Sequence, residues 1–207
     1  MFSEIQNVFA LFDQKKRTIK MAEGKCVAGE AMYSSSDLAE YQAKLSKLML
    51  EDSSAIFANY SRAHARCIIR TFFESARNSV SVLAGDFGND FYQLPDVRDA
   101  LRRAVANGAL VRVISLGTSE RSMNAVTEIR DELNNMRAGA VEVRFGVVRP
   151  GAQVKHYMVI DDKRYRLEDV HSDSVNAPVH AEVCCNGPSK AAALNVSFNN
   201  VWSRLAP

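Results

Sequence analysis

The residues best suited to chemistry gather in the last part of the chain, between positions 154 and 182. Histidine can attack an electrophile or exchange a proton near neutral pH, and carboxylates can act as general acids and bases. The histidines form neither an HxH nor an HxxxH pattern, so the spacing does not support a metal site, and we expect no metal and no cofactor. The polar residues of this region are His156, Asp161, Arg166, Glu168, Asp169, His171, His180 and Glu182.

The segments that carry these residues are predicted to be strands of one sheet. HYMVID and RYRLED flank the turn residues Asp162 and Lys163 and predict a β-hairpin, while HAEVCCN predicts a further strand. A two-residue turn would place position 156 opposite position 169. A His156–Asp169 pair is therefore the expected cross-strand contact, and it needs no function to explain it.

Upstream of the hairpin, the hydrophobic pattern changes its period near residue 78. SVSVLAGDF, LVRVISLG and VEVRFGVV predict strands, with helices between them over about residues 94–108 and 119–137. This alternation indicates βαβ units, so the predicted fold class is α/β, with a mixed, mostly parallel sheet flanked by helices. Gly85 and Gly117 follow two of the strands, where such sheets place ligand loops. The last helix carries an apolar stripe that we expect to seal the sheet, formed by Leu194, Phe198, Val201, Trp202 and Leu205.

The first part of the chain has a different pattern. Residues 1–77 are predicted to be a mostly helical region that precedes an α/β domain of residues 78–207. Apolar residues recur at helical spacing within the first twelve positions, and further helices are predicted over about residues 37–48 and 54–77.

The composition is that of an ordinary globular protein, with 47% hydrophobic and 24% charged residues. A net charge of +2 neither requires nor excludes nucleic acid. Arg62, Arg66 and Arg70 repeat every four residues, which is typical of a solvated helix face and compatible with a nucleic-acid groove. No apolar run approaches the ~20 residues of a membrane helix. The N-terminal segment does not resemble a secretory signal, and the four cysteines form no CxxC pair, so we expect reduced thiols in a cytoplasmic protein.

From about Asn78 to Leu205, the order of elements resembles one half of a phospholipase D (PLD) superfamily protein. The segments that carry the resemblance are VKHYMVIDD at 154–162, HAEV at 180–183 and LNVSFNNVWSRL at 194–205. The resemblance implies phosphodiester chemistry by an HxKxxxxD motif that is supplied twice. One histidine attacks phosphorus, the other protonates the leaving group, and the lysine holds phosphate oxygens. Because one copy is present here, the resemblance also implies that an active form would be a homodimer.

The motif itself has changed. When the MVID strand sets the register, Asp161 stands in the aspartate position, His156 in the lysine position and Val154 in the histidine position. Two residues along a strand span ~6.6 Å, whereas attack needs reacting atoms ~3–3.5 Å apart, so His156 cannot inherit the old geometry. In the same register, Glu168 and Asp169 replace the Gly-Ser pair of the family.

Two main hypotheses follow. In the first, the domain is catalytically degenerate and acts as a homodimeric binding or regulatory module, associated with nucleic-acid processing or with a protein partner. In the second, it is an active phosphodiesterase or nuclease in which His156 and Glu182 have been reassigned. A third hypothesis, a structural scaffold, differs from the first in having no ligand. We expect the vacated pocket to hold His156, Asp169 and Glu182, with a histidine bonded to a carboxylate. The candidate site residues are His156, Asp161, Glu168, His180 and Glu182.

Overall fold

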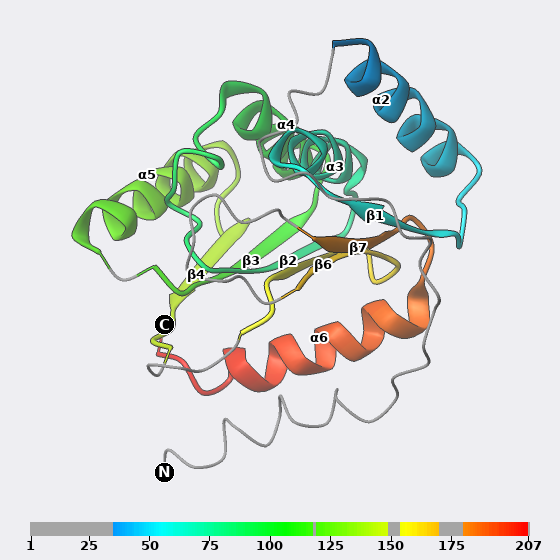
Figure 1. Ribbon diagram of the computed structural model, residues 1–207. Helices are drawn as coiled ribbons and strands as arrows, with labels where there is room; N and C mark the ends of the chain where they lie inside the picture. The colour runs from blue at the N-terminus through cyan, green and yellow to red at the C-terminus, as the bar shows by residue number, and fades with distance from the viewer. Residues whose placement is uncertain (1–34, 118, 149–153, 170–179, 207) are drawn as a thin grey trace.

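The computed structural model describes residues 35–117, 119–148, 154–169 and 180–206 (Figure 1). The helix predicted within the first twelve residues therefore lies outside the described residues. The described elements, in chain order, are α2 (Ser35–Leu50), β1 (Ile56–Asn59), α3 (Arg62–Ser75), β2 (Ser79–Ala84), α4 (Pro95–Ala106), β3 (Leu110–Ser115), α5 (Glu120–Met136), β4 (Val141–Phe145), β5 (Tyr157–Ile160), β6 (Arg164–Glu168), β7 (Ala181–Cys184) and α6 (Pro188–Trp202).

All seven of these strands belong to one sheet, in the order β1-β7-β6-β5-β2-β3-β4. β2, β3 and β4 pair in parallel, with α4 and α5 as the connections between them. The other four pairings, from β2–β5 to β1–β7, are antiparallel. The predicted mixed α/β sheet flanked by helices is confirmed. Its parallel part is smaller than expected, because the β5–β6 hairpin, β7 and β1 all extend the sheet by antiparallel pairing.

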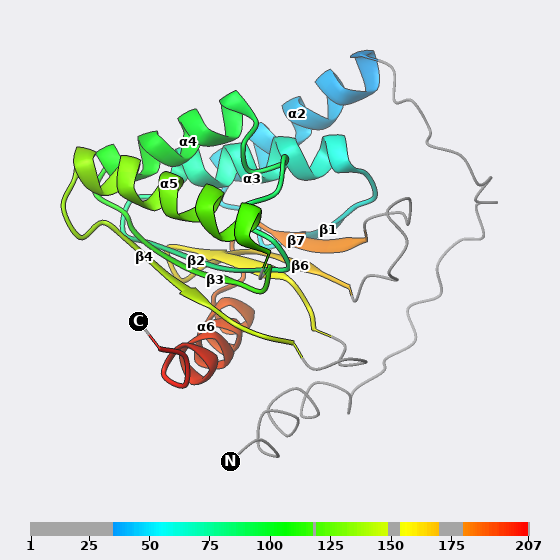
Figure 2. The same cartoon turned by 90° about the vertical axis from the view of Figure 1, so that its left-hand side faces the viewer.

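The helices form two layers. Figure 2 shows α2, α3, α4 and α5 over one face of the sheet and α6 alone over the other. On the α6 side, Phe198 and Trp202 are buried, as the apolar stripe predicted. The guanidinium of Arg144, on β4, lies 4.5 Å from the centre of the Trp202 ring and donates hydrogen bonds to the carbonyl oxygens of Trp202 and Leu205. The C-terminal end of α6 is thus tied to the sheet.

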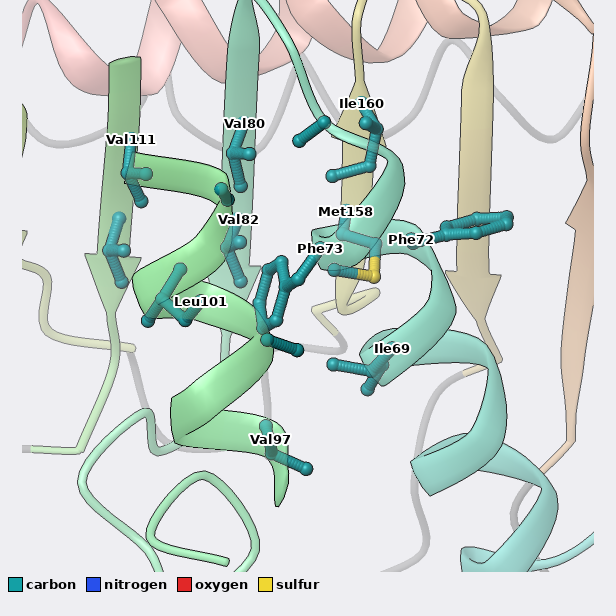
Figure 3. Packing of buried hydrophobic residues seen from close by; sticks show 14 of the residues in the cluster. Ile69, Phe72, Phe73, Val80, Val82, Val97, Leu101, Val111, Met158 and Ile160 are labelled. Carbon is teal, nitrogen blue, oxygen red and sulfur yellow. The ribbon is translucent and has the colours of Figure 1, made fainter. Parts of the chain in front are cut away.

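The larger core lies between the sheet and the α3–α4 layer. Phe73 of α3 and Leu101 of α4 meet Val80 and Val82 of β2 there, together with Met158 of β5 (Figure 3). Each strand contributes every second side chain to this face, because successive residues of a strand point to opposite sides. No helix of the described residues is long and apolar enough to cross a membrane.

The region before residue 78 departs from its prediction at one point. The helix expected over 37–48 is confirmed as part of α2, but the helix expected over 54–77 is wrong in its first third. There the chain forms β1, and α3 begins only after Ser61, whose hydroxyl accepts a hydrogen bond from the backbone N–H of His64. β1 pairs with β7, and α3 packs in the same hydrophobic core as β2.

Candidate functional site

The β5–β6 hairpin turns through three residues instead of the expected two. Ile160 pairs with Arg164, which leaves Asp161, Asp162 and Lys163 in the turn. Asp161 and Asp162 adopt the left-handed conformation, with φ of 50° and 55°. Aspartate tolerates this conformation better than most residues, because its short polar side chain can bond locally.

The longer turn changes which carboxylate meets His156. The peptide N–H of Glu168 donates to the carbonyl oxygen of His156 at 2.8 Å, so the two residues lie opposite each other. A shift of one residue moves every side chain of a strand to the other face of the sheet. The predicted His156–Asp169 pair is wrong for this reason. Asp169 is exposed, and its carboxylate lies 3.6 Å from the ammonium group of Lys155.

The carboxylate of Glu168 lies between an imidazole and a guanidinium. Its Oε1 accepts a hydrogen bond from Nη2 of Arg166 at 2.8 Å, and its Oε2 lies 3.7 Å from Nδ1 of His156. The side chains of Arg166 and Glu168 are only 6% and 13% exposed. Charges interact more strongly there than in water, because little solvent screens them. Nε of Arg166 donates to Oδ1 of the buried Asn59 at 3.0 Å.

The surroundings of this cluster explain its shape. A Cβ on Gly85 would lie 2.6 Å from Cε1 of His156, so only glycine lets the imidazole rest against the end of β2. Tyr92 lies close to the charged pair. Burial raises the pKa of its phenol, while the charge of Arg166 lowers that pKa and the charge of Glu168 raises it. Neither Asn59 nor Tyr92 was singled out by the sequence, whereas Gly85 was noted for its place after a strand.

Val154, in the position that the resemblance gives to the nucleophilic histidine, is part of an apolar surface. It is half-buried and packs against the cluster beneath α6, which includes Tyr157 and Phe198. A valine side chain has no lone pair with which to attack a phosphorus atom. Its packing gives Val154 a structural role in this apolar cluster.

Asp161 has a structural role at the far end of β5. Its carboxylate accepts hydrogen bonds from the backbone N–H groups of Arg77, Asn78 and Ser79, at distances from 2.7 to 3.2 Å. It thereby joins the hairpin turn to the start of β2. The five residue steps between His156 and Asp161 span ~17 Å of extended chain, so the two side chains do not share a site.

Glu182 and His180 also lie apart from the cluster. Glu182 is paired with Leu167 and points to the α6 face, whereas Glu168, one residue further on β6, points to the opposite face. The Glu182 carboxylate accepts a hydrogen bond from the hydroxyl of Tyr165, whose pKa is raised by burial and by this bond. His180 is exposed, and its ring packs edge-on against Tyr60 with the ring centres 5.3 Å apart.

Of the five candidate residues, the structure brings His156 and Glu168 together and separates the other three from them. Within one chain, the expected grouping of His156, Asp169 and Glu182 does not form. Arg166, which the sequence placed among the polar residues of the region, is a buried member of the cluster, and His171 lies outside the described residues. In the part of the chain that the structure describes, no group of three or more His, Cys, Asp or Glu side chains could hold a metal ion.

The arginine row on α3 joins this helix to α4 and to α2. Nε of Arg66 donates to both carboxylate oxygens of Asp96 of α4, at 2.9 and 3.1 Å, and Nη2 of Arg66 lies 2.8 Å from Oδ1 of the same carboxylate. Arg70 lies 3.8 Å from the same carboxylate and donates to the side chain of Gln42 on α2. Burial alone would raise the pKa of Asp96, but the hydrogen bond from Arg66 holds it below its usual value. At least two of the three arginines thus hold the helical layer together.

The chain was compared with known proteins. No family model and no curated protein matches it, but solved structures do. Nuc, a phospholipase D family member from Salmonella typhimurium, is 19% identical, with a TM-score of 0.57 over 73% of this chain and 96% of its own. NucT from Helicobacter pylori is 14% identical, with a TM-score of 0.51 and the same coverage. The archaeal chromatin protein TrmBL2, described as showing a novel mode of DNA binding, is 14% identical, with a TM-score of 0.55 over 81% of this chain and 62% of its own. The chain therefore shares its fold with Nuc, a phospholipase D family member, as its order of elements predicted.

Proposed function

We propose that this protein is a non-catalytic, homodimeric binding or regulatory module with a PLD-like fold. The observation that carries the proposal is Val154, which packs as an apolar side chain in the histidine position. His156, two residues further along, faces Glu168 and rests against Gly85. Neither residue can repeat the attack on phosphorus that the family reaction requires, because the first has no nucleophilic atom and the second is displaced along the chain.

The charge of the cluster gives further support. A phosphodiester is an anion, and an enzyme that cleaves one gathers positive charge around it. Here the buried Arg166 is paired with Glu168, so the two formal charges cancel within hydrogen-bonding distance. A site of this kind attracts a phosphodiester weakly.

The proposed partners and location have support of their own. The family motif is used in pairs, and this chain carries one copy of the region, so we propose that two chains associate with the 154–171 region near their two-fold axis. A nucleic acid, bound outside the cluster of His156, Arg166 and Glu168, is the ligand that we propose for the dimer, since TrmBL2 combines the same fold with DNA binding. Cys67, Cys184 and Cys185 are buried free thiols, which suits the proposed cytoplasmic location.

The competing function is an active phosphodiesterase that uses His156 and Glu182. It would require both side chains at one reaction centre, but within one chain they lie on opposite faces of the sheet. A turnover assay separates the two functions. We expect no hydrolysis of a chromogenic phosphodiester, single-stranded DNA or RNA above the buffer rate, with or without divalent metal. Turnover that disappears in His156→Ala and persists in the matched variant His180→Ala would overturn the proposal.

A further inference from the structure

The Glu168 carboxylate lies where any anion would have two nitrogen-bearing neighbours. It lies at the end of β6, between the guanidinium of Arg166 and the imidazole of His156, and each of its oxygens faces one of these groups. We propose that Glu168 is an internal substitute for phosphate and that this one residue excludes phosphate-bearing ligands from the site. The inference rests on the proposed non-catalytic function and adds to it the residue that sets ligand selectivity.

The guanidinium of Arg166 can bind either a carboxylate or a phosphate. A guanidinium binds carboxylates and phosphates through the same planar fork of N–H donors. The fork of Arg166 is fixed in direction, since its Nε already donates to Asn59 at 3.0 Å and its Nη2 to Glu168 at 2.8 Å. An arriving phosphate would therefore have to take the place that the carboxylate holds.

The backbone keeps Glu168 in this place. Arg166 and Glu168 are two residues apart on β6, so their side chains share one face of the sheet. The N–H of Glu168 is bonded to the carbonyl oxygen of His156, which fixes the end of the strand. If the carboxylate swung outward, the 6% exposed side chain of Arg166 would keep a buried charge without compensation. The ion pair between Arg166 and Glu168 thus keeps other anions from binding to Arg166.

The resemblance to the PLD superfamily places Glu168 where the family has the glycine of its Gly-Ser pair. A glycine there would leave open the space that the carboxylate now fills. Within this chain, the substitution brings a negative charge to a position that borders two nitrogen-bearing groups. We therefore attribute the exclusion of phosphate to the side chain of Glu168, and one amino-acid substitution there is enough to test it.

The test is the Glu168→Gln variant, which keeps the size of the side chain and removes its charge. Inorganic phosphate is titrated into the wild type and the variant by isothermal calorimetry, in chloride buffer of matched ionic strength. We expect phosphate to bind the variant at least about tenfold more tightly than the wild type, because Arg166 then needs an anion. Thermal unfolding should show the same difference, since a ligand that binds only the folded state raises the midpoint.

Two further variants serve as controls. Glu182→Gln makes the same change of charge on the neighbouring strand, on the opposite face, and should leave phosphate affinity at the wild-type value. Arg166→Gln combined with Glu168→Gln removes both charges and should abolish the gain. Should Glu168→Gln fold poorly, its refolding yield in phosphate and in chloride becomes the measurement, and we expect recovery in phosphate alone.

Equal phosphate affinities in wild type and Glu168→Gln would overturn the inference. So would the same gain in Glu182→Gln, or a Glu168→Gln chain that folds in neither anion. The outcome is separate from that of the turnover assay. Phosphate binding by Glu168→Gln without hydrolysis supports both proposals, whereas hydrolysis by the wild type removes the proposed function alone.

Discussion

Arg166 keeps its charge almost entirely away from water, and this makes the site sensitive to the loss of any partner. Its guanidinium is held by Glu168 on the same strand and by Asn59 on β1. Asn59 is itself buried, and its amide nitrogen donates to the carbonyl oxygen of Ser61 at 2.7 Å. One asparagine thus orients the cation and fixes the turn between β1 and α3.

We expect Asn59→Ala to lower the free energy of unfolding by about 1–3 kcal/mol, because it leaves the Nε–H of a buried guanidinium without an acceptor. Urea denaturation monitored by Trp202 fluorescence provides the measurement. Asn124→Ala, at an exposed position of α5, is the matched control and should change stability by less than about 0.5 kcal/mol. If the two variants are equally stable, Asn59 does not support Arg166.

The residues of the cluster were predictable to different degrees. His156 and Glu168 stood out because their types and spacing suggested chemistry, and the sheet does bring them together. Their pairing was missed because the sequence Asp161-Asp162-Lys163 does not reveal that two aspartates adopt positive φ and lengthen the turn. The burial of Arg166 was missed because its acceptor, Asn59, lies in a segment that was predicted to be helical.

At the scale of elements, the hydrophobic periodicity of the sequence predicted those helices and strands whose own residues show a helical or strand-like pattern. The helices α4, α5 and α6 and the strands β2, β3 and β4 follow their predicted segments closely. β1 was not predicted, because its four residues become a strand only by pairing with β7 at the other end of the chain.

The ion pair between Arg66 and Asp96 joins α3 to α4, and it should make stability depend on pH. The folded-state pKa of Asp96 lies below its usual value, so its contribution is present above the unfolded pKa of ~3.9 and is lost as pH falls through the folded pKa. We expect Asp96→Asn to cost about 0.5–1 kcal/mol at pH 7, since the pair is partly exposed.

The difference between wild type and Asp96→Asn should narrow as pH falls below the unfolded pKa of ~3.9 towards the lower pKa of the folded state, because Asp96 then loses its charge. Chemical denaturation across pH 3 to 7 measures it. Asp90→Asn, whose carboxylate is 86% exposed, should differ little from wild type across that range. A constant difference between wild type and Asp96→Asn at every pH would show that the ionised pair does not stabilise the layer.

At the scale of the whole molecule, the resemblance to the phospholipase D superfamily implies a site built from two copies of this region, and the chain carries one. If two chains meet at the 154–171 region, Lys155 lies near its own copy across the two-fold axis, because it immediately precedes His156. We expect light scattering to give twice the chain mass at high micromolar concentration.

Reversing the charge in Lys155→Glu should raise the dimer Kd by about tenfold, because the ammonium group that offsets Asp169 is lost and each chain then brings two carboxylates to the axis. Arg121→Glu, at a fully solvated position of α5, is the matched control and should leave the Kd unchanged. A wild-type protein that remains monomeric at high micromolar concentration would rule out the dimer.

We propose that this PLD-like domain does not form a covalent phosphohistidine, because Val154 stands in the histidine position of the family motif. Intact-mass spectrometry tests this most directly, after incubation with an activated phosphodiester and an alkaline quench that preserves phosphorus–nitrogen bonds. We expect the mass of the unmodified chain at every time point. A phosphorylated species that maps to His156, and is absent from His156→Ala, would contradict the account.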